Sequence, residues 1–354
     1  MGAARRMRIE VGGSEDAATT FARDQLMTLR CADDGVARAR VWRRPHSGLL
    51  LGRFHRADSA SCGPPGESGP AVSAASGGLS RRLSGGRIVP VGPGVVCITM
   101  TVAVVDWLDP AGKALRPEQV LNRALRPLLA MLRGDGVAAF YGGRDLVTVE
   151  GRPIAHASFT VMRDGAAVVE MHVAEAAAFA ELPSLLDRHD PRGTAGVDRD
   201  ALRGATSLVE MGVAARSDQE WTERVAAFSA SGFACDACVA TDGEGDVTTA
   251  HPSAAHDFLA DPGPAEEGVR GAAAVSMLGV VECSGRVDGD RLHDLRVTGD
   301  LIAPFHTLDD IAGECEGEPL RPDAIRKALA RVMARPRSFV LGLRELDELI
   351  LRIA

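Results

Sequence analysis

Residues 81–105 read RRLSGGRIVPVGPGVVCITMTVAVV, a glycine loop with arginines that leads into the longest apolar run of the chain. Gly85 and Gly86 permit a close backbone approach to a ligand, and the arginines before them can form paired hydrogen bonds to phosphate oxygens. The run Val95–Val105 spans 11 residues, well short of the roughly 18 that cross a membrane. Its β-branched residues favour a buried strand. The stretch therefore predicts either a phosphate-binding loop or an arginine-rich surface turn, followed by a core strand.

Composition limits the classes of function. The 354 residues allow two domains of roughly 150 residues each. A net charge of −8 offers no broad positive field, so we expect no nucleic-acid or membrane partner. The N-terminus lacks the apolar stretch of a secretory signal, and the seven cysteines are too few for a dense disulfide framework. We expect a cytoplasmic protein with reduced thiols.

Periodicity and turn residues predict the elements around the loop. Upstream we expect a helix at Phe21–Arg30, strands at Val36–Arg43 and Leu49–Gly52, and a long loop at residues 57–78. Downstream we expect helices at Pro117–Arg133, Ala174–Leu186 and Asp218–Ser231, with strands at Val137–Tyr141, Leu146–Val149, Ile154–Met162 and Ala166–Val173. The C-terminal part predicts strands at Ala272–Cys283 and Leu292–Val297, then helices at Leu308–Cys315, Pro322–Ala334 and Leu343–Ile353.

These elements predict an α+β protein with a mixed or antiparallel sheet flanked by helices. We assign residues 1–239 to a catalytic-type domain, residues 240–271 to a linker rich in Gly, Pro, Asp and Glu, and residues 272–354 to a small α/β accessory domain.

Two further segments carry candidate chemistry. GRDLVTVEGRPIAHAS (Gly143–Ser158) alternates glycine–arginine turns with short strands, which predicts a hairpin that lines a pocket or is ordinary antiparallel sheet. In RVWRRPHSGLLLGRFHR (Arg40–Arg56), Leu49–Leu51 are predicted to lie in the core and the arginines to form a solvated rim.

Taken in order, the three segments resemble the lipoate–protein ligase family of the biotin/lipoate ligase superfamily. RRLSGGR is similar to that family's Arg-Arg-x-Ser-Gly-Gly-Gly adenylate loop, and GRDLVTVEGRPIAH to its Gly-Arg-Asn-Asp hairpin ending in Gly-Arg-Lys. Asp24 matches the acidic residue of the family's first helix. Residues 279–300 are similar to the accessory domain of the longer ligases.

The resemblance implies a biotin/lipoate ligase-like fold and a two-step reaction. ATP, assisted by Mg, would convert lipoate or octanoate to an acyl-adenylate, and the acyl group would then pass to a lysine of a lipoyl carrier domain. The resemblance places Arg53, Arg81, Arg82, Ser84, Gly85, Gly86, Arg144 and Asp145 at the ATP or acyl-adenylate, with Asp145 also a candidate metal ligand. It places Leu49, Leu50 and Leu51 at the acyl chain.

Three positions depart from the family pattern. Pro153 stands where the family has its lysine, and proline has neither an ammonium group nor a backbone N–H. Arg87 replaces the third glycine of the loop. Asp145 and Leu146 stand at the two positions where the family has Asn and Asp, although a shift of one residue would align Asp145 with the family's Asp. His156 on the same hairpin could replace a missing polar contact or simply be hydrogen-bonded within the fold.

Two hypotheses follow. The chain is a lipoate–protein ligase-like enzyme that acts on the lipoyl carrier domain of a 2-oxoacid dehydrogenase complex or on the glycine-cleavage carrier protein. Alternatively, it is a catalytically inactive relative that binds an acyl ligand, a nucleotide or a carrier domain without turnover. The catalytic residue is unassigned, because Pro153 occupies the lysine position.

Overall fold

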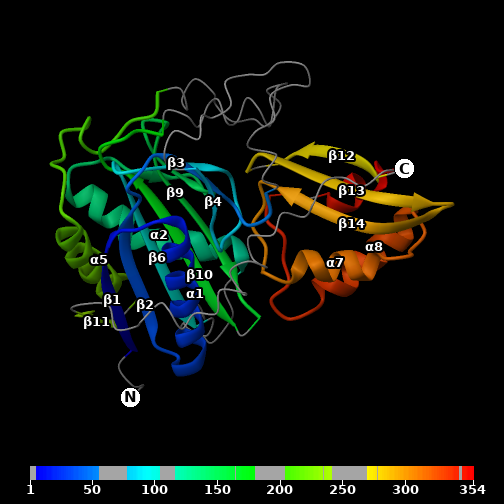
Figure 1. Ribbon diagram of the computed structural model, residues 1–354, viewed down its shortest axis with the longest axis horizontal. Helices are drawn as coiled ribbons and strands as arrows, with labels where there is room; N and C mark the ends of the chain where they lie inside the picture. The colour runs from blue at the N-terminus through cyan, green and yellow to red at the C-terminus, as the bar shows by residue number, and fades with distance from the viewer. Residues whose placement is uncertain are drawn as a thin grey trace.

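The structure is a computed structural model that describes residues 5–55, 78–103, 116–163, 165–179, 204–233, 235–240, 269–276, 278–342 and 345–354. Its architecture is α+β, as predicted. A large sheet with helices is built mainly from the N-terminal two thirds of the chain, and a smaller sheet with its own helices follows at the C-terminus (Figure 1).

The large sheet has eight strands in the order β11-β1-β2-β6-β10-β9-β8-β7. In chain order these are β1 (Arg5–Ser14), β2 (Ala37–Arg43), β6 (Val95–Ala103), β7 (Phe140–Tyr141), β8 (Leu146–Val149), β9 (Arg152–Val161), β10 (Ala166–Ala174) and β11 (Cys235–Ala240). Strand β1 runs parallel to β2 and β11, and the remaining neighbours are antiparallel. The prediction of a mixed sheet is confirmed.

Alternation along β10 separates the two faces of this sheet. Val169 and Met171 belong to the main hydrophobic cluster, together with residues of α2 (Pro117–Gly134) and α5 (Asp218–Phe233). Between them, Glu170 and His172 are also buried but lie on the opposite face, which carries α1 (Ala17–Asp34). One face of the sheet is therefore an apolar core, and the other holds buried polar groups.

A small three-stranded sheet, β4-β3-β5, holds the segment around the arginine–glycine loop. It contains β3 (Gly48–Leu51), β4 (Leu79–Arg81) and β5 (Val89–Val91). β3 pairs with β4 in parallel and with β5 in antiparallel orientation. The loop between β4 and β5 is thereby fixed at both ends. The long loop predicted at residues 57–78 lies outside the described residues, apart from Gly78.

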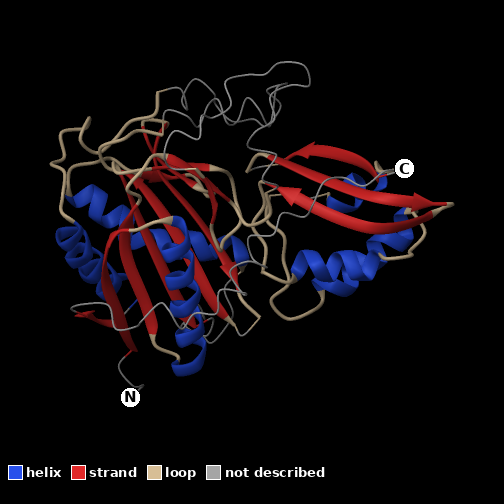
Figure 2. Cartoon of the chain, in the orientation of Figure 1, coloured by secondary structure: helices blue, strands red, loops and turns tan. Residues whose placement is uncertain are grey.

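The C-terminal part forms a second unit with its own core. Its sheet contains β12 (Val269–Val275), β13 (Val280–Asp288) and β14 (Arg291–Gly299), and its helices are α7 (Thr307–Cys315), α8 (Pro322–Met333) and α9 (Leu346–Leu351). The helices and the sheet share one hydrophobic cluster, and Figure 2 shows α7 and α8 lying along one side of the sheet. The predicted linker lies mostly outside the described residues, and β12 begins within its predicted range.

Several predicted elements need correction. The run Ala272–Cys283 is two strands, because the chain turns at Ser276 and Gly279. The helix predicted at Ala174–Leu186 does not begin at Ala174, which ends β10. Residues 175–177 form bends, residues 178–179 are irregular, and residues 180–186 lie outside the described part. Strand β1 was not predicted, although Met7 and Ile9 are fully buried between exposed or half-buried Arg8 and Glu10.

Other predictions agree with the structure. Helix α2 begins at Pro117, and α1 contains the predicted helix but is longer, from its cap at Asp16 to left-handed Gly35. The cysteines whose side chains are described are buried thiols outside any disulfide bond: Cys31, Cys97, Cys283 and Cys315. No helix in the described residues has the length and apolarity to cross a membrane.

Candidate active site

The arginine–glycine loop is buried, so it is not a surface turn. Arg82, Ser84 and Arg87 have exposed fractions of 3%, 0% and 3%. The loop lies on the polar face of the large sheet, where Arg82 Nε donates to Ser158 Oγ of β9 at 3.2 Å. The Ser84 and Ser158 hydroxyls also share a hydrogen bond. Strand pairing and side-chain contacts together fix the shape of the loop.

Arg82 organises the loop from the inside. Its Nη2 donates to the carbonyl oxygens of Gly85 at 2.5 Å and Arg87 at 2.7 Å, and its Nη1 donates to Leu50 O at 3.1 Å. Each hydrogen bond described for this guanidinium goes to a neutral oxygen. Burial lowers the pKa of Arg82 to about 10, although Glu170 and Asp145 oppose that shift. Arg82 is thus a buried cation with no ion pair among the described residues.

Arg81 and Arg53 lie at the entrance of the loop. Arg81 Nη1 donates to Arg53 O at 2.8 Å and also to the His55 carbonyl. The Arg53 guanidinium lies 3.5 Å from the centroid of the Phe305 ring, and its backbone N–H donates to Ser84 O at 2.8 Å. Burial lowers the pKa of Arg53 to about 9. The two arginines lie at the loop, and their contact with ATP or an acyl-adenylate stays a prediction.

Glu170 of β10 anchors the centre of the loop and was not predicted from the sequence. Its Oε2 accepts the backbone N–H of Ser84 at 2.7 Å. Burial, assisted by the charge of Asp24, raises the pKa of Glu170 to about 7. The signal in the sequence was a single glutamate and a single histidine in the otherwise apolar run AAVVEMHVA. Both side chains lie on the polar face of the sheet, where the loop lies.

Arg87 and Asp145 form a buried ion pair at the end of the loop. Arg87 Nε and Nη2 donate to the two oxygens of Asp145 at 2.5 and 2.8 Å. His156 Nε2 lies 3.6 Å from Asp145 Oδ2, and its Nδ1 lies 3.3 Å from Nδ1 of His172. Burial lowers the pKa of both histidines, so they are neutral. Two departures from the family pattern, Arg87 and Asp145, therefore contact each other.

Pro153 lies at the start of β9 and has neither a polar side-chain group nor a backbone N–H. Its ring is buried, and its carbonyl accepts the Thr206 N–H at 3.4 Å. Arg152 is partly exposed and pairs with Glu150 at 3.5 Å, so it does not replace the missing ammonium. The hairpin itself is confirmed: β8 and β9 are antiparallel, and Glu150 and Gly151 form the turn with φ of 51° and 80°.

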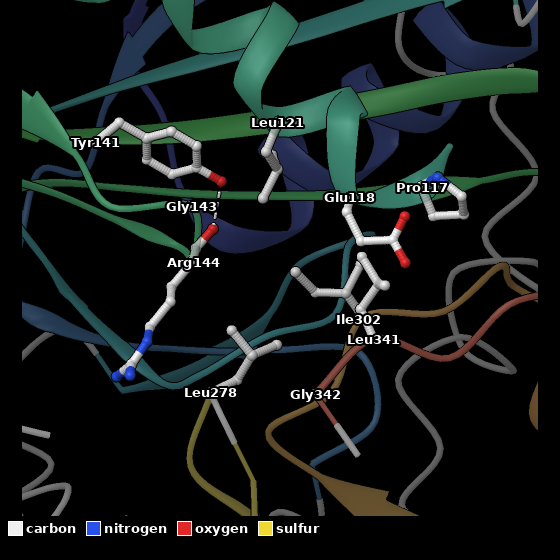
Figure 3. Close-up of a pocket in the computed structure, with 10 residues that line it drawn as sticks. All are labelled: Pro117, Glu118, Leu121, Tyr141, Gly143, Arg144, Leu278, Ile302, Leu341 and Gly342. Atoms are coloured by element: carbon white, nitrogen blue, oxygen red, sulfur yellow. Dashed lines mark hydrogen bonds between the residues drawn. The ribbon is translucent and has the colours of Figure 1, made fainter. Parts of the chain in front are cut away.

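No hydrogen bond or ion pair described for Arg144 joins it to the loop, and its predicted role at the ATP stays a prediction. Arg144 lines a pocket of about 40 Å³ that contains none of the loop residues. The other lining residues come from both parts of the chain: Pro117, Glu118, Leu121, Tyr141, Gly143, Leu278, Ile302, Leu341 and Gly342. Figure 3 shows Arg144 pointing away from Leu121, with its carbonyl bonded to the Tyr141 hydroxyl. The space holds a few water molecules at most.

The predicted acyl-pocket leucines lie in β3 beneath the loop. Leu49 and Leu51 pack with Ile88, whereas Leu50 packs with Trp42 on the opposite side of the strand. All three are buried, as predicted for a core segment. Their role as an acyl wall stays a prediction.

The arginines near Trp42 do not form a solvated rim, which corrects the sequence prediction. Arg40 is fully buried; its Nε and Nη1 donate to Asp24 at 2.7 Å and Glu15 at 2.6 Å. Arg44 is 7% exposed and lies 5.4 Å from the centroid of the Trp42 ring. Asp24 thus acts within the polar layer as the counter-ion of Arg40.

The C-terminal part closes over the glycines of the loop. Gly86 N–H donates to Leu301 O at 2.6 Å, and a Cβ on Gly85 would overlap that same carbonyl oxygen. Asp300 lies 3.0 Å from Nε2 of His55. Glycine is therefore required at residue 85 by the approach of Leu301. No sequence pattern predicted this contact, because it joins segments more than 200 residues apart.

The residues around Asp145 do not fit a divalent metal ion. Both carboxylate oxygens already accept hydrogen bonds from Arg87. No group of three His, Cys, Asp or Glu side chains in the described part of the chain is arranged to hold a metal. Mg²⁺ prefers several hard oxygen ligands without a competing cation beside them. The predicted role of Asp145 as a metal ligand has no support from this arrangement.

No protein-family model and no curated sequence matches the chain, but solved structures do match its fold. The match to P. falciparum LipL1 in complex with lipoate has a TM-score of 0.67 at 12% identity and covers 98% of this chain and 99% of that one. A bipartite lipoate protein ligase from Thermoplasma acidophilum, studied with its E2 lipoyl domain, matches with a TM-score of 0.53 at 15% identity, covering 68% and 88%. The putative lipoate protein ligase Ta0514 of T. acidophilum matches with 0.50 at 14%, covering 72% and 94%.

Proposed function

Starting from the lipoate–protein ligase fold that this chain adopts, we propose that it is a lipoate–protein ligase-like enzyme. In the proposed reaction ATP activates lipoate or octanoate as an acyl-adenylate. The acyl group then passes to a lysine of a lipoyl carrier domain, in a 2-oxoacid dehydrogenase complex or the glycine-cleavage system. The catalytic unit would be residues 1–239, the accessory domain residues 272–354, and a cytoplasmic location stays a prediction.

The observation that carries this proposal is the buried arginine–glycine loop on the polar face of the sheet. Adenylate formation depends largely on positioning and on stabilising charge, which a loop fixed by Arg82 and Glu170 supplies. Leu49 and Leu51, which pack against Ile88, are the apolar groups that we propose for contact with an acyl chain. The Gly86 N–H now bonds Leu301 O, so a ligand that takes this donor must displace that carbonyl.

A second candidate function is binding without turnover, and Pro153 favours it. The family's lysine contacts the carboxylate and the adenylate, whereas Pro153 is a buried ring. Losing one preorganised donor costs about 10² to 10³ in rate. Of the two lysines in the chain, Lys327 lies on α8, and Lys113 lies outside the described residues. Such a protein would bind an acyl ligand, a nucleotide or a carrier domain.

The test is ATP–pyrophosphate exchange with lipoate and with octanoate, comparing the natural protein with Pro153→Lys. Pro153→Ala is the matched control, because it removes the ring without adding an ammonium group. Exchange by the natural protein supports an active ligase. Exchange by Pro153→Lys alone supports a disabled ligase with an intact pocket.

Ligand protection separates the remaining outcomes. If none of the three proteins catalyses exchange, a rise in Tm with a non-hydrolysable acyl-adenylate analogue would support the binding function. The reason is that a ligand that binds the folded state stabilises it. Silence in the exchange assay together with an unchanged Tm would contradict both candidate functions.

A further inference from the structure

Arg87 is an arginine inside a glycine loop, and its guanidinium is held in one orientation. The side chain is 3% exposed, and Asp145 binds it through Nε and Nη2. The third nitrogen, Nη1, is buried and has no hydrogen-bond partner among the described residues. Leaving a buried donor of a charged group unpaired is costly. The arrangement therefore presents a fixed cation with one donor nitrogen unused.

A second unused donor lies on the other side of Asp145. His156 and His172 face each other through Nδ1, so one of these nitrogens carries the hydrogen and the other accepts it. If His172 donates, the hydrogen of neutral His156 resides on Nε2, which is the favourable tautomer beside the Asp145 carboxylate at 3.6 Å. His156 Nε2 is buried without a hydrogen-bond partner among the described residues.

The charge around the loop also favours an anion. Arg87 is neutralised by Asp145, but the hydrogen bonds described for Arg82 all go to neutral oxygens. Glu170 lies near Arg82, and one of its carboxylate oxygens accepts the Ser84 N–H. A buried guanidinium without a paired carboxylate is stabilised by an anionic ligand. Phosphate oxygens suit the planar donor groups of arginine.

We propose that Arg87 is a built-in cation of the nucleotide site, which takes the place of a divalent metal ion beside Asp145 and binds a phosphoryl oxygen through Nη1. This inference rests on the proposed function, because it takes the ligand of the loop to be a nucleotide. Asp145 positions the guanidinium, and His156 Nε2 supplies an additional donor on the far side of the carboxylate. ATP then binds this loop without a metal ion.

The test is isothermal titration calorimetry of ATP binding to the full chain, in excess EDTA and in excess Mg²⁺. For the natural protein we expect the two Kd values to agree within about threefold. For Arg87→Gly we expect Kd in EDTA to rise by at least about tenfold, as for the loss of a charged hydrogen bond. Mg²⁺ should restore part of this loss, because Asp145 is then free to accept it.

Two further variants make the test decisive. Arg87→Gly/Asp145→Asn removes both charges, avoids a buried unpaired carboxylate, and should bind ATP weakly in both solutions. Arg38→Gly is the matched control: it also removes a buried arginine that pairs with an aspartate, but this arginine lies on β2 and its partner, Asp34, is 38% exposed. It should bind ATP as the natural protein does.

Three results would overturn the inference: ATP binding by the natural protein that requires Mg²⁺, unchanged metal-free binding by the double variant, or no ATP binding in either solution. These outcomes are distinct from failure of the proposed function. Metal-free ATP binding without pyrophosphate exchange retains Arg87 as the cation and removes the ligase activity. If pyrophosphate exchange occurs but ATP binding requires Mg²⁺, the ligase activity is retained and the role of Arg87 as the cation is removed.

Discussion

The carboxyl group of Glu170 should give the protein a distinctive dependence of stability on pH. Glu170 is 2% exposed, and burial raises its pKa from 4.5 to about 7. The folded state therefore holds a proton that the unfolded state releases at lower pH. Stability from this group is fully present below about pH 4.5 and is lost as the pH rises through about 7. Over the whole range the loss is about 3 kcal/mol.

Replacing Glu170 with glutamine removes this titration while keeping an oxygen that can accept the Ser84 N–H. Between pH 5 and pH 8 the free energy of unfolding of the natural protein should fall by about 2.5 kcal/mol more than that of Glu170→Gln. Urea unfolding at pH 5, 6, 7 and 8 measures this, with buried Trp42 and Trp221 as fluorescence reporters.

The exposed residue Glu223 on α5 provides the control, since Glu223→Gln changes the same chemical group outside the core. Its pH profile should follow that of the natural protein. If the profiles of Glu170→Gln and the natural protein are parallel from pH 5 to pH 8, the carboxyl group does not hold its proton as the burial implies. That result would refute the argument that burial on the polar face raises the pKa of Glu170.

Two other substitutions test the packing of the loop and the polar layer. Gly85→Ala should lower the free energy of unfolding by about 1–3 kcal/mol, because the new methyl group overlaps Leu301 O; stability equal to that of the natural protein in urea would show that this contact is absent. Arg40→Ala should cost about 3–5 kcal/mol, because two buried carboxylates lose their cation. The exposed ion-pair variant Arg326→Ala is its control and should stay within about 1 kcal/mol, so equal losses in the two arginine variants would contradict a special role for burial.

The buried polar layer is the reason that this face is a candidate site. Arg40 with its two carboxylates, the Arg87–Asp145 pair and Glu170 are all buried behind α1 and the loop. Replacing such groups by apolar residues is often neutral or stabilising, so they are weak contributors to stability. Groups of this kind with strongly perturbed pKa values are candidates for a functional site. The layer is thus more consistent with ligand chemistry than with packing alone.

Local patterns predicted the elements that depend on local interactions. The helix at Pro117 begins where a first-turn proline is favourable, and the hairpin around Gly151 follows from its glycine turn. Strand β6 was evident because most of its residues are β-branched, and in the structure nearly all of them are buried. Strand β1 was not, since its arginines masked the alternation of Met7 and Ile9. The helix predicted from Ala174 was wrong there, because pairing with β6 extends β10 through that residue.

The sequence by itself determined the α+β class, many of the helices and strands, and the loop that resembles an adenylate-binding motif. Only the tertiary structure decided which charges meet. Arg87 and Asp145 lie 58 residues apart and form an ion pair, and Glu170 reaches Ser84 from a distant strand. Leu301 reaches Gly86 across the two parts of the chain. The physical reason is that helix and strand patterns arise from neighbours in sequence, whereas burial and charge pairing depend on which segments the sheet brings together.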